Sequence, residues 1–422
     1  MDLNKIDKNH LWHPLTQHKL HPEHIPIKSA KGVLIEDFNG NKYIDGIASW
    51  YTCMYGHCNE HIISKVHNQM KQLDHVVFTG FTHEPATKLA KALIKILPKN
   101  QQKLFFSDNG STSVDIAIKM AFQFHFNKSE KRRKKIIAFE DSFHGDTFGA
   151  MSVSGLSIYN GPFEDFFINV ERIPVPTQLN IEDVKNTIKS LISNNDVAAF
   201  IYEPLVQGAA AMKMHKAKHL DQLLKIFKDN KIITIADEVM TGFGKTGKNF
   251  ASEHMTNLPD IICLSKSLTG GLIPMAITSC SEHIYNAFLS SKMEKGFFHG
   301  HTYSANPTAC TAALASIELL NSNEIQNNIK MVIDSHKEFN SKIKDHIKVK
   351  STRQQGVIFA LDLNVEMKRY GELRYKLFNF YMQKGVYLRP LGNTVYILAP
   401  FVISKNQLQK IYNAIEESFE LF

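Results

Sequence analysis

The sequence predicts an α/β fold in which helices cover both faces of a mostly parallel sheet. Short apolar runs that suit strands alternate with longer runs whose apolar residues recur every three or four positions, as in amphipathic helices. The strand-like runs are nearly continuous in apolar residues, which is typical of strands buried on both faces. In such sheets, ligands bind at the carboxyl ends of the strands, so the polar residues there, His144 and Glu203 among them, are the first candidates for a site.

The alternation of helices and strands begins near residue 85. The predicted elements are a helix at 85–97, a strand and turn at 103–111, a helix at 111–126, a strand and turn at 134–145, a strand at 196–204, a helix at 218–230, and strands at 231–239, 260–267 and 275–281. After about residue 320 we expect a long helix at 324–347, strands within 356–363 and 385–400, and a helix from Lys405. The NG pair in EDFNGNKY predicts a hairpin near the N-terminus.

The length of the chain predicts two domains, because 422 residues exceed what one hydrophobic core usually supports. The alternating part suggests a large α/β domain at residues 56–322. The more mixed texture after residue 320 suggests a smaller α+β domain, made from residues 323–422 together with residues 1–55.

Composition indicates an ordinary soluble globular protein, with 43% hydrophobic and 21% charged residues. The net charge of +8 is modest for this length, and the basic run KSEKRRKK suits a solvated helix end, so we expect no nucleic-acid partner. No signal peptide and no apolar run of about 18–20 residues is visible, so we expect a cytoplasmic protein without membrane segments.

Five cysteines in a chain of this length argue against a disulfide framework and for a reducing compartment. Cys53, His57 and Cys58 lie close together in the sequence, which invites a zinc interpretation. Because no second pair of ligands with suitable spacing accompanies them, we expect no metal.

One lysine follows a buried-looking strand almost without interruption. Lys266 comes just after the apolar run IICL at 261–264 and before a glycine pair. A lysine there costs several kcal/mol unless it is neutral, paired or covalently modified. Burial lowers a lysine pKa and makes the amine nucleophilic, as a bond to an aldehyde cofactor requires. The alternative is a lysine that extends along apolar surface and keeps its ammonium group in water.

Other strand ends supply groups that would complement pyridoxal phosphate. Asp237 ends the run ITIAD, and a carboxylate at that depth needs a cation, such as the protonated pyridine nitrogen of that cofactor. The segment DNGSTS offers backbone N–H groups and small hydroxyls at a helix start, around Gly110 and Ser111, which suits a phosphate. Asp237 could instead be a helix cap or a metal ligand, and DNGS could be a plain capping turn. Phe143 could lie flat on the cofactor ring or, alternatively, occupy a position in the core.

Six motifs in order carry a resemblance to a known family. They are SDNGSTSVDIAIKMA, FHGDTFGAMS, IYEPLVQGAAAM, IADEVMTGFGKTG, DIICLSKSLTGG and HGHTYSANPTAC. The chain resembles the class III aminotransferases, which are pyridoxal 5'-phosphate enzymes of fold type I, from about Leu11 to the C-terminus. The resemblance implies a mostly parallel seven-stranded sheet, a homodimer, and a two-stage transfer of an amino group between small molecules.

The resemblance also implies roles for the residues in the cofactor motifs. Lys266 would hold the cofactor covalently and move the proton during catalysis, and Asp237 would pair with the pyridinium nitrogen. Gly110 and Ser111 would bind the phosphate, and Phe143 would stack on the ring.

Further roles are implied across the dimer interface and on the substrate side. Thr302 would reach a phosphate across the interface, with Gly300 and His301 beside it. The residues implied to bind substrate are Leu15, Trp50, Tyr51, Phe143, Asp146, Gly300 and Arg389. Arg389 would pair with a substrate carboxylate, for which its planar guanidinium is suited. Asp146 would recognise an amine or, alternatively, cap the following helix.

Within the class III group, further stretches are similar to the branch that makes 7,8-diaminononanoate in biotin synthesis. They are HLWHPLTQ, IDGIASWY, HVVFTGFTHEPA, FHGDTFGAMSVSG and GVYLRPLGNTVYILAP. This similarity implies transfer of an amino group from S-adenosylmethionine to 8-amino-7-oxononanoate. Lysine as the amino donor, or a different ω-amino acid reaction of the class III group, are the alternatives.

Four positions depart from the common pattern of this branch. Leu15 and Phe143 stand where tyrosine is common, Tyr51 where tryptophan is common, and His301 where proline is usual. In members that use S-adenosylmethionine, the tyrosine at the position of Leu15 is linked to stacking on adenine, and leucine offers neither ring nor hydroxyl. The departures lie in the pocket, so they bear on the identity of the donor rather than on the cofactor.

Overall fold

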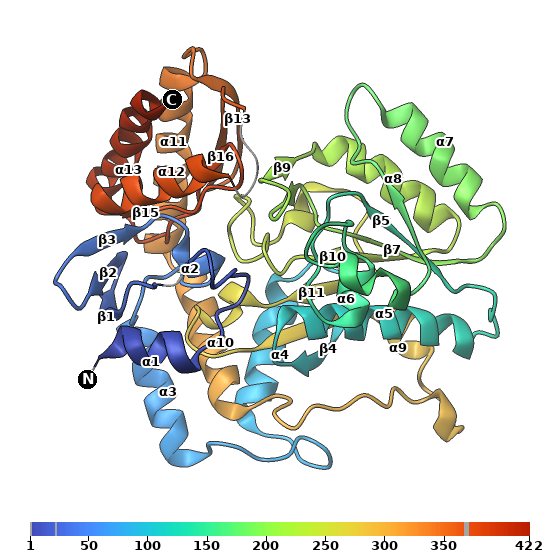
Figure 1. The fold of residues 1–422 in the computed structure, drawn as a ribbon. Coiled ribbons are helices and arrows are strands. Elements are labelled where there is room, and N and C mark those ends of the chain that lie inside the picture. Colours follow the sequence, from blue (N-terminus) through green and yellow to red (C-terminus); the bar gives the residue numbers. More distant parts are fainter. Residues whose placement is uncertain (1, 22, 367–370) are drawn as a thin grey trace.

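A seven-stranded sheet forms the centre of the larger part of the chain in the computed structural model, which describes residues 2–21, 23–366 and 371–422 (Figure 1). In spatial order its strands are β4 (Gln101–Ser107), β12 (Ala276–Ser281), β11 (Ile261–Leu264), β10 (Ile233–Asp237), β7 (Val197–Tyr202), β5 (Lys135–Phe139) and β6 (Val170–Ile173). β12 runs antiparallel to both of its neighbours, whereas the other neighbouring pairs are parallel. The predicted α/β fold with a mostly parallel sheet is confirmed.

Helices cover both faces of this sheet because successive strand residues point to opposite sides. Ile136 and Ile235 belong to one apolar cluster, which includes residues of helix α5, whereas Ile137 and Phe200 belong to a second cluster with residues of α7, α8 and α10. The helices and short turns of this part are α3 (Glu60–Gln72), α4 (Glu84–Ile96), α5 (Gly110–Asn127), α6 (Phe148–Ser152), α7 (Ile181–Ile192), α8 (Ala217–Asp229), α9 (Glu282–Asn286) and α10 (Pro307–Leu320). Burying each such strand side chain stabilises the fold by roughly 1.5–3 kcal/mol.

The two ends of the chain together build further sheets. One contains β1 (Ile27–Lys31), β2 (Leu34–Asp37), β3 (Lys42–Asp45) and β15 (Val386–Tyr387), and another contains β13 (Val349–Gln355), β14 (Ile358–Leu363) and β16 (Thr394–Ile397). The helices of these ends are α1 (Leu3–His10), the short α2 (Ala48–Tyr51), α11 (Asn323–Ile343), α12 (Glu372–Gln383) and α13 (Lys405–Glu417). The parallel pairing of β15 with β3 supports the proposed small domain of residues 1–55 and 323–422 beside a large domain of residues 56–322.

The predicted N-terminal hairpin is confirmed, since β2 and β3 pair antiparallel around a turn in which Gly40 has a φ of 84°. Strand β6 at the edge of the central sheet was not predicted. Its sequence, VERI, places two charged residues between apolar ones and is only four residues long. It therefore lacks the continuous apolar run that indicates the buried strands.

Candidate active site

A cavity of about 340 Å³ lies at the carboxyl ends of the central strands. Residues that follow β4, β5, β7, β10 and β11 line it together with residues from both ends of the chain. The predicted site residues that line it are Leu15, Trp50, Tyr51, Gly110, Ser111, Phe143, Asp146, Asp237, Lys266 and Arg389. The fold thus gathers side chains that are far apart in the sequence around one space.

Lys266 begins a short 3-10 turn directly after β11, and its backbone is left-handed with a φ of 50°. A non-glycine residue in this conformation costs roughly 1–2 kcal/mol, and such strain concentrates at functional sites. Its Nζ lies 5.1 Å from the centroid of the Tyr51 ring. Burial lowers the pKa of Lys266, against the opposing effect of the negative charges of Asp237 and Glu203. The lowered pKa increases the fraction of neutral, nucleophilic amine near pH 7.

Asp237 ends β10 and is 5% exposed. Its Oδ1 accepts the N–H of Val239 at 3.1 Å, and its Oδ2 lies 2.7 Å from Nδ1 of His144. Nε2 of His144 is buried and has no hydrogen-bond partner among the residues that the structure describes. The imidazole and the backbone N–H together fix the orientation of the carboxylate.

Glu203 follows β7 and holds the loop that carries Phe143. Its carboxylate accepts the N–H of Phe143 at 2.9 Å and the N–H of Gly208 at 3.0 Å. Burial raises the pKa of Glu203 to about 7; the charge of His144 opposes this rise, and that of Asp237 adds to it. Glu203 therefore changes its charge near neutral pH at the wall of the cavity.

The start of helix α5 offers a site for an anion. The side chain of Asn109 accepts the N–H of Thr112 at 3.0 Å, and the first turn leaves other backbone N–H groups without partners inside the helix. These groups and the helix dipole favour a phosphate. A Cβ on Gly110 would lie 2.8 Å from Cγ1 of Val239, so no larger residue fits without displacing its neighbour.

The turn that carries Trp50 and Tyr51 is strained. Residues 48–51 (α2, Ala48–Tyr51) have φ angles between 45° and 72°, so four successive non-glycine residues are left-handed. At about 1–2 kcal/mol each, this conformation persists only where surrounding contacts hold it. One such contact is the hydroxyl of Ser267, which donates to the carbonyl of Tyr51 at 2.8 Å and joins this turn to the one that begins at Lys266.

A buried carboxylate supports the same turn from the other side. Asp45 accepts the N–H of Ile47 at 3.2 Å and the hydroxyl of Ser49 at 2.8 Å, and lies 2.8 Å from Nε2 of His57. Burial lowers the pKa of His57, but its hydrogen bonds to Asp45 and Cys53 outweigh this effect and raise it to about 10. A charged His57 therefore pairs with Asp45 at neutral pH and fixes the base of the turn.

Arg389 and two aromatic residues form the opposite wall. The guanidinium carbon of Arg389 lies 4.9 Å from the centroid of the Trp50 ring, a distance that allows a cation–π contact. The hydroxyl of Tyr51 donates to that of Tyr396 at 3.0 Å, and burial raises the pKa of Tyr51 well above its ordinary value. Leu15, which is 49% exposed, adds an apolar edge. This wall combines one cation with apolar and aromatic surface.

Asp146 is exposed, and its backbone N–H donates to the hydroxyl of Ser111 at 3.2 Å. The alternative of Asp146 as the cap of the following helix is wrong, because Thr147 occupies the cap position of α6. The structure therefore leaves the carboxylate of Asp146 at the rim of the cavity.

The predicted residues Gly300, His301 and Thr302 do not line the cavity of their own chain. Gly300 and Thr302 are exposed, and Nε2 of His301 lies 3.2 Å from Oδ2 of Asp108, just after β4. The segment therefore runs beside the start of α5 without entering the cavity.

Several residues of the site were not among the predicted site residues. His144 and Glu203 were recognised only as polar residues at strand ends, and their bonds to Asp237 and Phe143 depend on packing between strands. Tyr396 lines the cavity from a strand near the C-terminus, and no sequence signal connects it to Tyr51.

Comparisons with known proteins agree with this geometry. The family model described as Aminotransferase class-III matches residues 15–419. The chain belongs to the class III aminotransferases. A curated relative of this class III aminotransferase, from Synechococcus elongatus, is named adenosylmethionine-8-amino-7-oxononanoate aminotransferase and is 42% identical, with 97% of this chain and 98% of the relative covered. A Helicobacter pylori relative of the same name is 34% identical, with 99% and 97% covered.

Solved structures agree with the family. A crystal structure of the Methanocaldococcus jannaschii enzyme of that name has a TM-score of 0.94 and 33% identity to this class III aminotransferase, covering 99% of this chain and 98% of the other. An amine transaminase from an uncultivated Pseudomonas species, with its pyridoxal phosphate bound, has a TM-score of 0.92 and 25% identity, with 97% and 98% covered. The enzyme is accordingly a transaminase that depends on pyridoxal 5'-phosphate.

The side chains of this class III aminotransferase fit that cofactor. Lys266 offers an amine and Asp237 a buried, oriented carboxylate from adjacent strands, since Asp237 pairs in register with Cys263 of β11. Gly110 packs against Val239 at the start of α5, where a Cβ would lie 2.8 Å from Cγ1 of that residue, and the N–H groups of this helix start suit a phosphate. Amine, acid and anion site therefore border the same cavity.

Proposed function

We propose that this enzyme transfers an amino group from S-adenosylmethionine to 8-amino-7-oxononanoate and so forms 7,8-diaminononanoate for biotin synthesis. Relatives named for this pair of substrates align over nearly the whole chain. The observation that carries the proposal is that Lys266 shares one cavity with Trp50, Tyr51 and Arg389. The acceptor has an aliphatic chain with a carboxylate at its end, so it suits a pocket with an apolar wall and one guanidinium group.

Lys266 would act as the attachment point and as the base. When bound, pyridoxal phosphate supplies an electron-withdrawing ring to the carbon that gains or loses the amino group. Lys266 would bond to the cofactor and be set free when an amine substrate takes its place. The freed amine stays beside the reacting carbon, where it would remove and return a proton, and its lowered pKa favours the neutral form that this task needs.

The other residues of the strand ends would orient the cofactor. Asp237 would keep a proton on the pyridine nitrogen, and His144 would hold Asp237 in place through the 2.7 Å contact. Gly110 and Ser111 would donate hydrogen bonds to the phosphate, and Phe143 would lie against the ring.

The opposite wall would bind the substrates. Arg389 would pair with the carboxylate of the acceptor through two parallel hydrogen bonds. Trp50 and Tyr51 would pack against its aliphatic chain, while Asp146 at the rim would attract an amino group. Leu15 would contact the donor.

Lysine is the second candidate donor, because Leu15 lacks the ring and the hydroxyl that would stack on adenine. A donor screen decides between them: purified enzyme receives 8-amino-7-oxononanoate with S-adenosylmethionine or with lysine as the sole amine source, and 7,8-diaminononanoate is measured by mass spectrometry. We expect product with S-adenosylmethionine. If product forms with lysine and not with S-adenosylmethionine, lysine is the donor. If product forms with neither, the proposed reaction is overturned.

We further propose that two chains form a homodimer in which Thr302 serves the cofactor phosphate of the neighbouring site. The exposure of Gly300 and Thr302, and their absence from the cavity of their own chain, support this arrangement.

A cytoplasmic location is part of the same proposal. All five cysteines are free, as expected in a reducing compartment. Every helix in the described ranges is too short or too polar to span a bilayer.

A further inference from the structure

A second cavity, of about 350 Å³, adjoins the active-site cavity. Its walls come from residues within 141–146 after β5, within 151–160 around the end of α6, and within 209–213 between β8 (Val206–Gln207) and the start of β9 (Lys213–Met214). Five residues line both cavities, namely Phe143, Gly145, Asp146, Tyr159 and Ala209. The two cavities therefore meet at Asp146 and Tyr159, so one elongated ligand can occupy both.

Hydrogen bonds hold the wall that carries Tyr159 in place. Asn160 is 3% exposed; its Oδ1 accepts the N–H of Ser157 at 2.8 Å, and its Nδ2 donates to the carbonyl of Gly155 at 2.9 Å. The N–H of Gly155 donates to the carbonyl of Ser142 in the loop after β5 at 2.8 Å. The N–H of Tyr159 donates to the hydroxyl of Ser157 at 3.2 Å. The second cavity is therefore formed before a ligand binds, which lowers the cost of binding.

The charges of the second cavity favour a cation. Among the described residues that line it, only Asp141, Asp146 and Lys213 are charged. Nζ of Lys213 lies 3.1 Å from Oδ2 of Asp141, so these two charges balance. The carboxylate of Asp146 remains, at the boundary with the first cavity, and it attracts a positive charge to that boundary.

S-adenosylmethionine, the donor proposed above, has two parts joined by a positively charged sulfur. Its amino-acid part has to reach Lys266 in the first cavity, which also has to hold the cofactor. At about 340 Å³, that cavity is near the lower end of the roughly 300–1,000 Å³ that ligand pockets span. The adenosyl part needs further space, and the second cavity offers it beyond Asp146.

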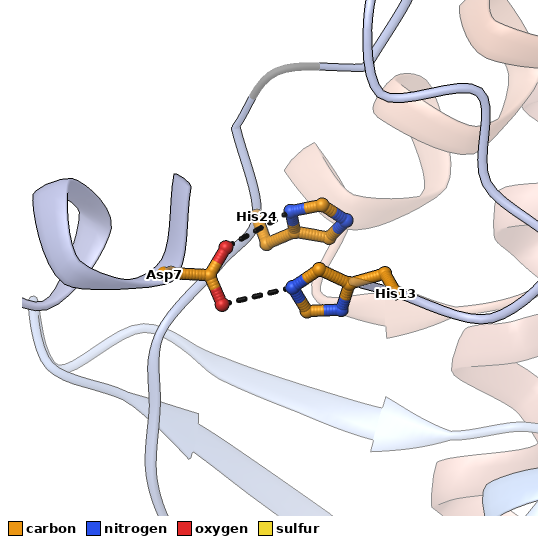
Figure 2. A group of neighbouring side chains, drawn as sticks. All are labelled: Asp7, His13 and His24. Carbon is orange, nitrogen blue, oxygen red and sulfur yellow. Dashed lines mark hydrogen bonds and ion pairs between the residues drawn. The ribbon is translucent and has the colours of Figure 1, made fainter. Parts of the chain in front are cut away.

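The adenine base needs an aromatic partner that Leu15 does not supply. Leu15 lies two residues after His13, whose Nε2 lies 2.8 Å from Oδ1 of Asp7 on α1 (Figure 2). Of the two cavities, Leu15 lines only the first, whereas Tyr159 lines both. An aromatic ring stacks on any base, because every base has a π-face. Tyr159 is therefore placed to supply the ring.

We propose that the second cavity binds the adenosyl group of S-adenosylmethionine. Tyr159 stacks on the adenine, and the carboxylate of Asp146 lies beside the positively charged sulfur. The ring that is missing at Leu15 is thus replaced by one from another part of the chain. This inference rests on the proposed function, because it names where the donor of that reaction binds.

Titration calorimetry of 5'-methylthioadenosine into the cofactor-loaded enzyme tests the site without amino transfer, because this nucleoside lacks the amino-acid part of the donor. We expect one nucleoside per chain in the wild type. Tyr159→Ala should weaken its affinity by roughly 5–150-fold, the range for one base stacked on an aromatic ring. Tyr159→Phe keeps the ring and should bind like the wild type. Phe166→Ala is the matched control, because Phe166 is an exposed aromatic residue of the neighbouring 3-10 turn (Gly161–Phe166) and lines neither cavity.

The proposal would be overturned if the wild type binds no stoichiometric nucleoside, if Tyr159→Ala binds it as tightly, or if Phe166→Ala loses binding to the same extent. Thermal unfolding checks that the variants fold.

Steady-state kinetics separates this site from the reaction itself. The KM for S-adenosylmethionine should rise in Tyr159→Ala, whereas the KM for 8-amino-7-oxononanoate should not. Amino transfer from S-adenosylmethionine with a KM that does not depend on Tyr159 would remove the site and leave the proposed function. Nucleoside binding that depends on Tyr159, without amino transfer from S-adenosylmethionine, would support the site and overturn the proposed donor.

Discussion

Two lysines stand close to the site, and their different exposure separates their roles, since Lys245 is buried and Lys266 is only partly buried. Nζ of Lys245 donates to the carbonyl of Gly242 at 2.9 Å and its side chain is fully buried, whereas Lys266 lines the cavity. Burial lowers the pKa of both amines. Only Lys266 is in position to react with a molecule in the cavity.

Lys266→Ala should abolish covalent attachment of the cofactor. After borohydride reduction, intact mass spectrometry should find the cofactor on the wild type and not on Lys266→Ala, and activity should fall by at least roughly 10²–10⁴-fold because the base is lost. Lys245→Met is the control and should keep the adduct. If the adduct persists in Lys266→Ala, or disappears only in Lys245→Met, then Lys266 is not the residue that binds the cofactor covalently.

Glu203 makes the stability of the protein depend on pH. Its pKa rises on folding from an ordinary 4.5 to about 7, so the folded state binds its proton more tightly. The resulting stability is fully present below pH 4.5 and is lost as the pH rises through 7. The free energy of unfolding of Glu203→Gln relative to the wild type should therefore increase by about 3 kcal/mol between pH 4.5 and pH 8. Denaturant titrations at both pH values measure it, and a constant difference would contradict the raised pKa.

Single residues were predictable where a charge interrupts an apolar strand end. Lys266 and Asp237 stand out in this way, and the structure places both at the cavity. The partners of such residues were not predictable: His144 contacts Asp237 from a loop after another strand, and Tyr396 meets Tyr51 from the far end of the chain. These contacts arise from packing and leave no local pattern.

At the level of elements, the left-handed turn of residues 48–51 depends on the pair of Asp45 and His57. The side chain of Asp45 is 0% exposed and that of His57 is 14% exposed, so the pair is shielded from water. The left-handed conformation of the turn places Trp50 and Tyr51 at the cavity. Loss of the pair should therefore weaken substrate binding as well as lower the stability of the protein.

His57→Gln tests this positioning role. The free energy of unfolding should fall by about 1.5–3 kcal/mol, the range for a hydrogen bond to a charged group. The KM for the acceptor should rise several-fold while kcat changes less, because Trp50 and Tyr51 move but Lys266 does not. His61→Gln, on an exposed histidine that pairs with Glu318, should stay within about 0.5 kcal/mol of the wild type. If stability falls but the KM is unchanged, His57 stabilises the fold and does not position the substrate-binding residues.

Elements were predictable to different degrees. Apolar runs in the sequence predict the buried strands around residues 135–139, 197–202 and 233–237, and the structure contains all three. The turn at 48–51 gives no such signal, because its sequence ASWY has no glycine or asparagine to indicate left-handed backbone. Contacts that include those of Asp45, His57 and Ser267 hold the turn in that conformation.

On the scale of the whole molecule, the proposed dimer makes each site depend on two chains. Thr302→Ala should weaken cofactor binding, because the phosphate would lose a hydroxyl donor. Equilibrium dialysis of the cofactor measures the effect, and Ser304→Ala, a neighbouring hydroxyl that bonds within its own chain to the carbonyl of Phe106, is the control. Unaltered binding in Thr302→Ala would remove this residue from the phosphate site.

Mixing variants separates a role across the interface from a role within one chain. In a dimer of Lys266→Ala with Thr302→Ala, the site that keeps Lys266 would receive an intact Thr302 from the other chain. At a cofactor concentration too low to fill the sites of Thr302→Ala, mixed and re-equilibrated variants should therefore show more activity than either variant alone. No recovery in verified mixed dimers would mean that Thr302 acts within its own chain or not at all.

The identity of the amino-group acceptor is the central claim about the molecule, and a single-turnover experiment tests it most directly. Enzyme preloaded with one amino group per site is mixed in separate samples with 8-amino-7-oxononanoate, succinic semialdehyde or 2-oxoglutarate, and loss of that amino group from the enzyme is followed by absorbance. We predict rapid loss with 8-amino-7-oxononanoate, accompanied by 7,8-diaminononanoate, and slow loss with the other two. Rapid discharge by succinic semialdehyde or 2-oxoglutarate, with 8-amino-7-oxononanoate inert, would contradict the account.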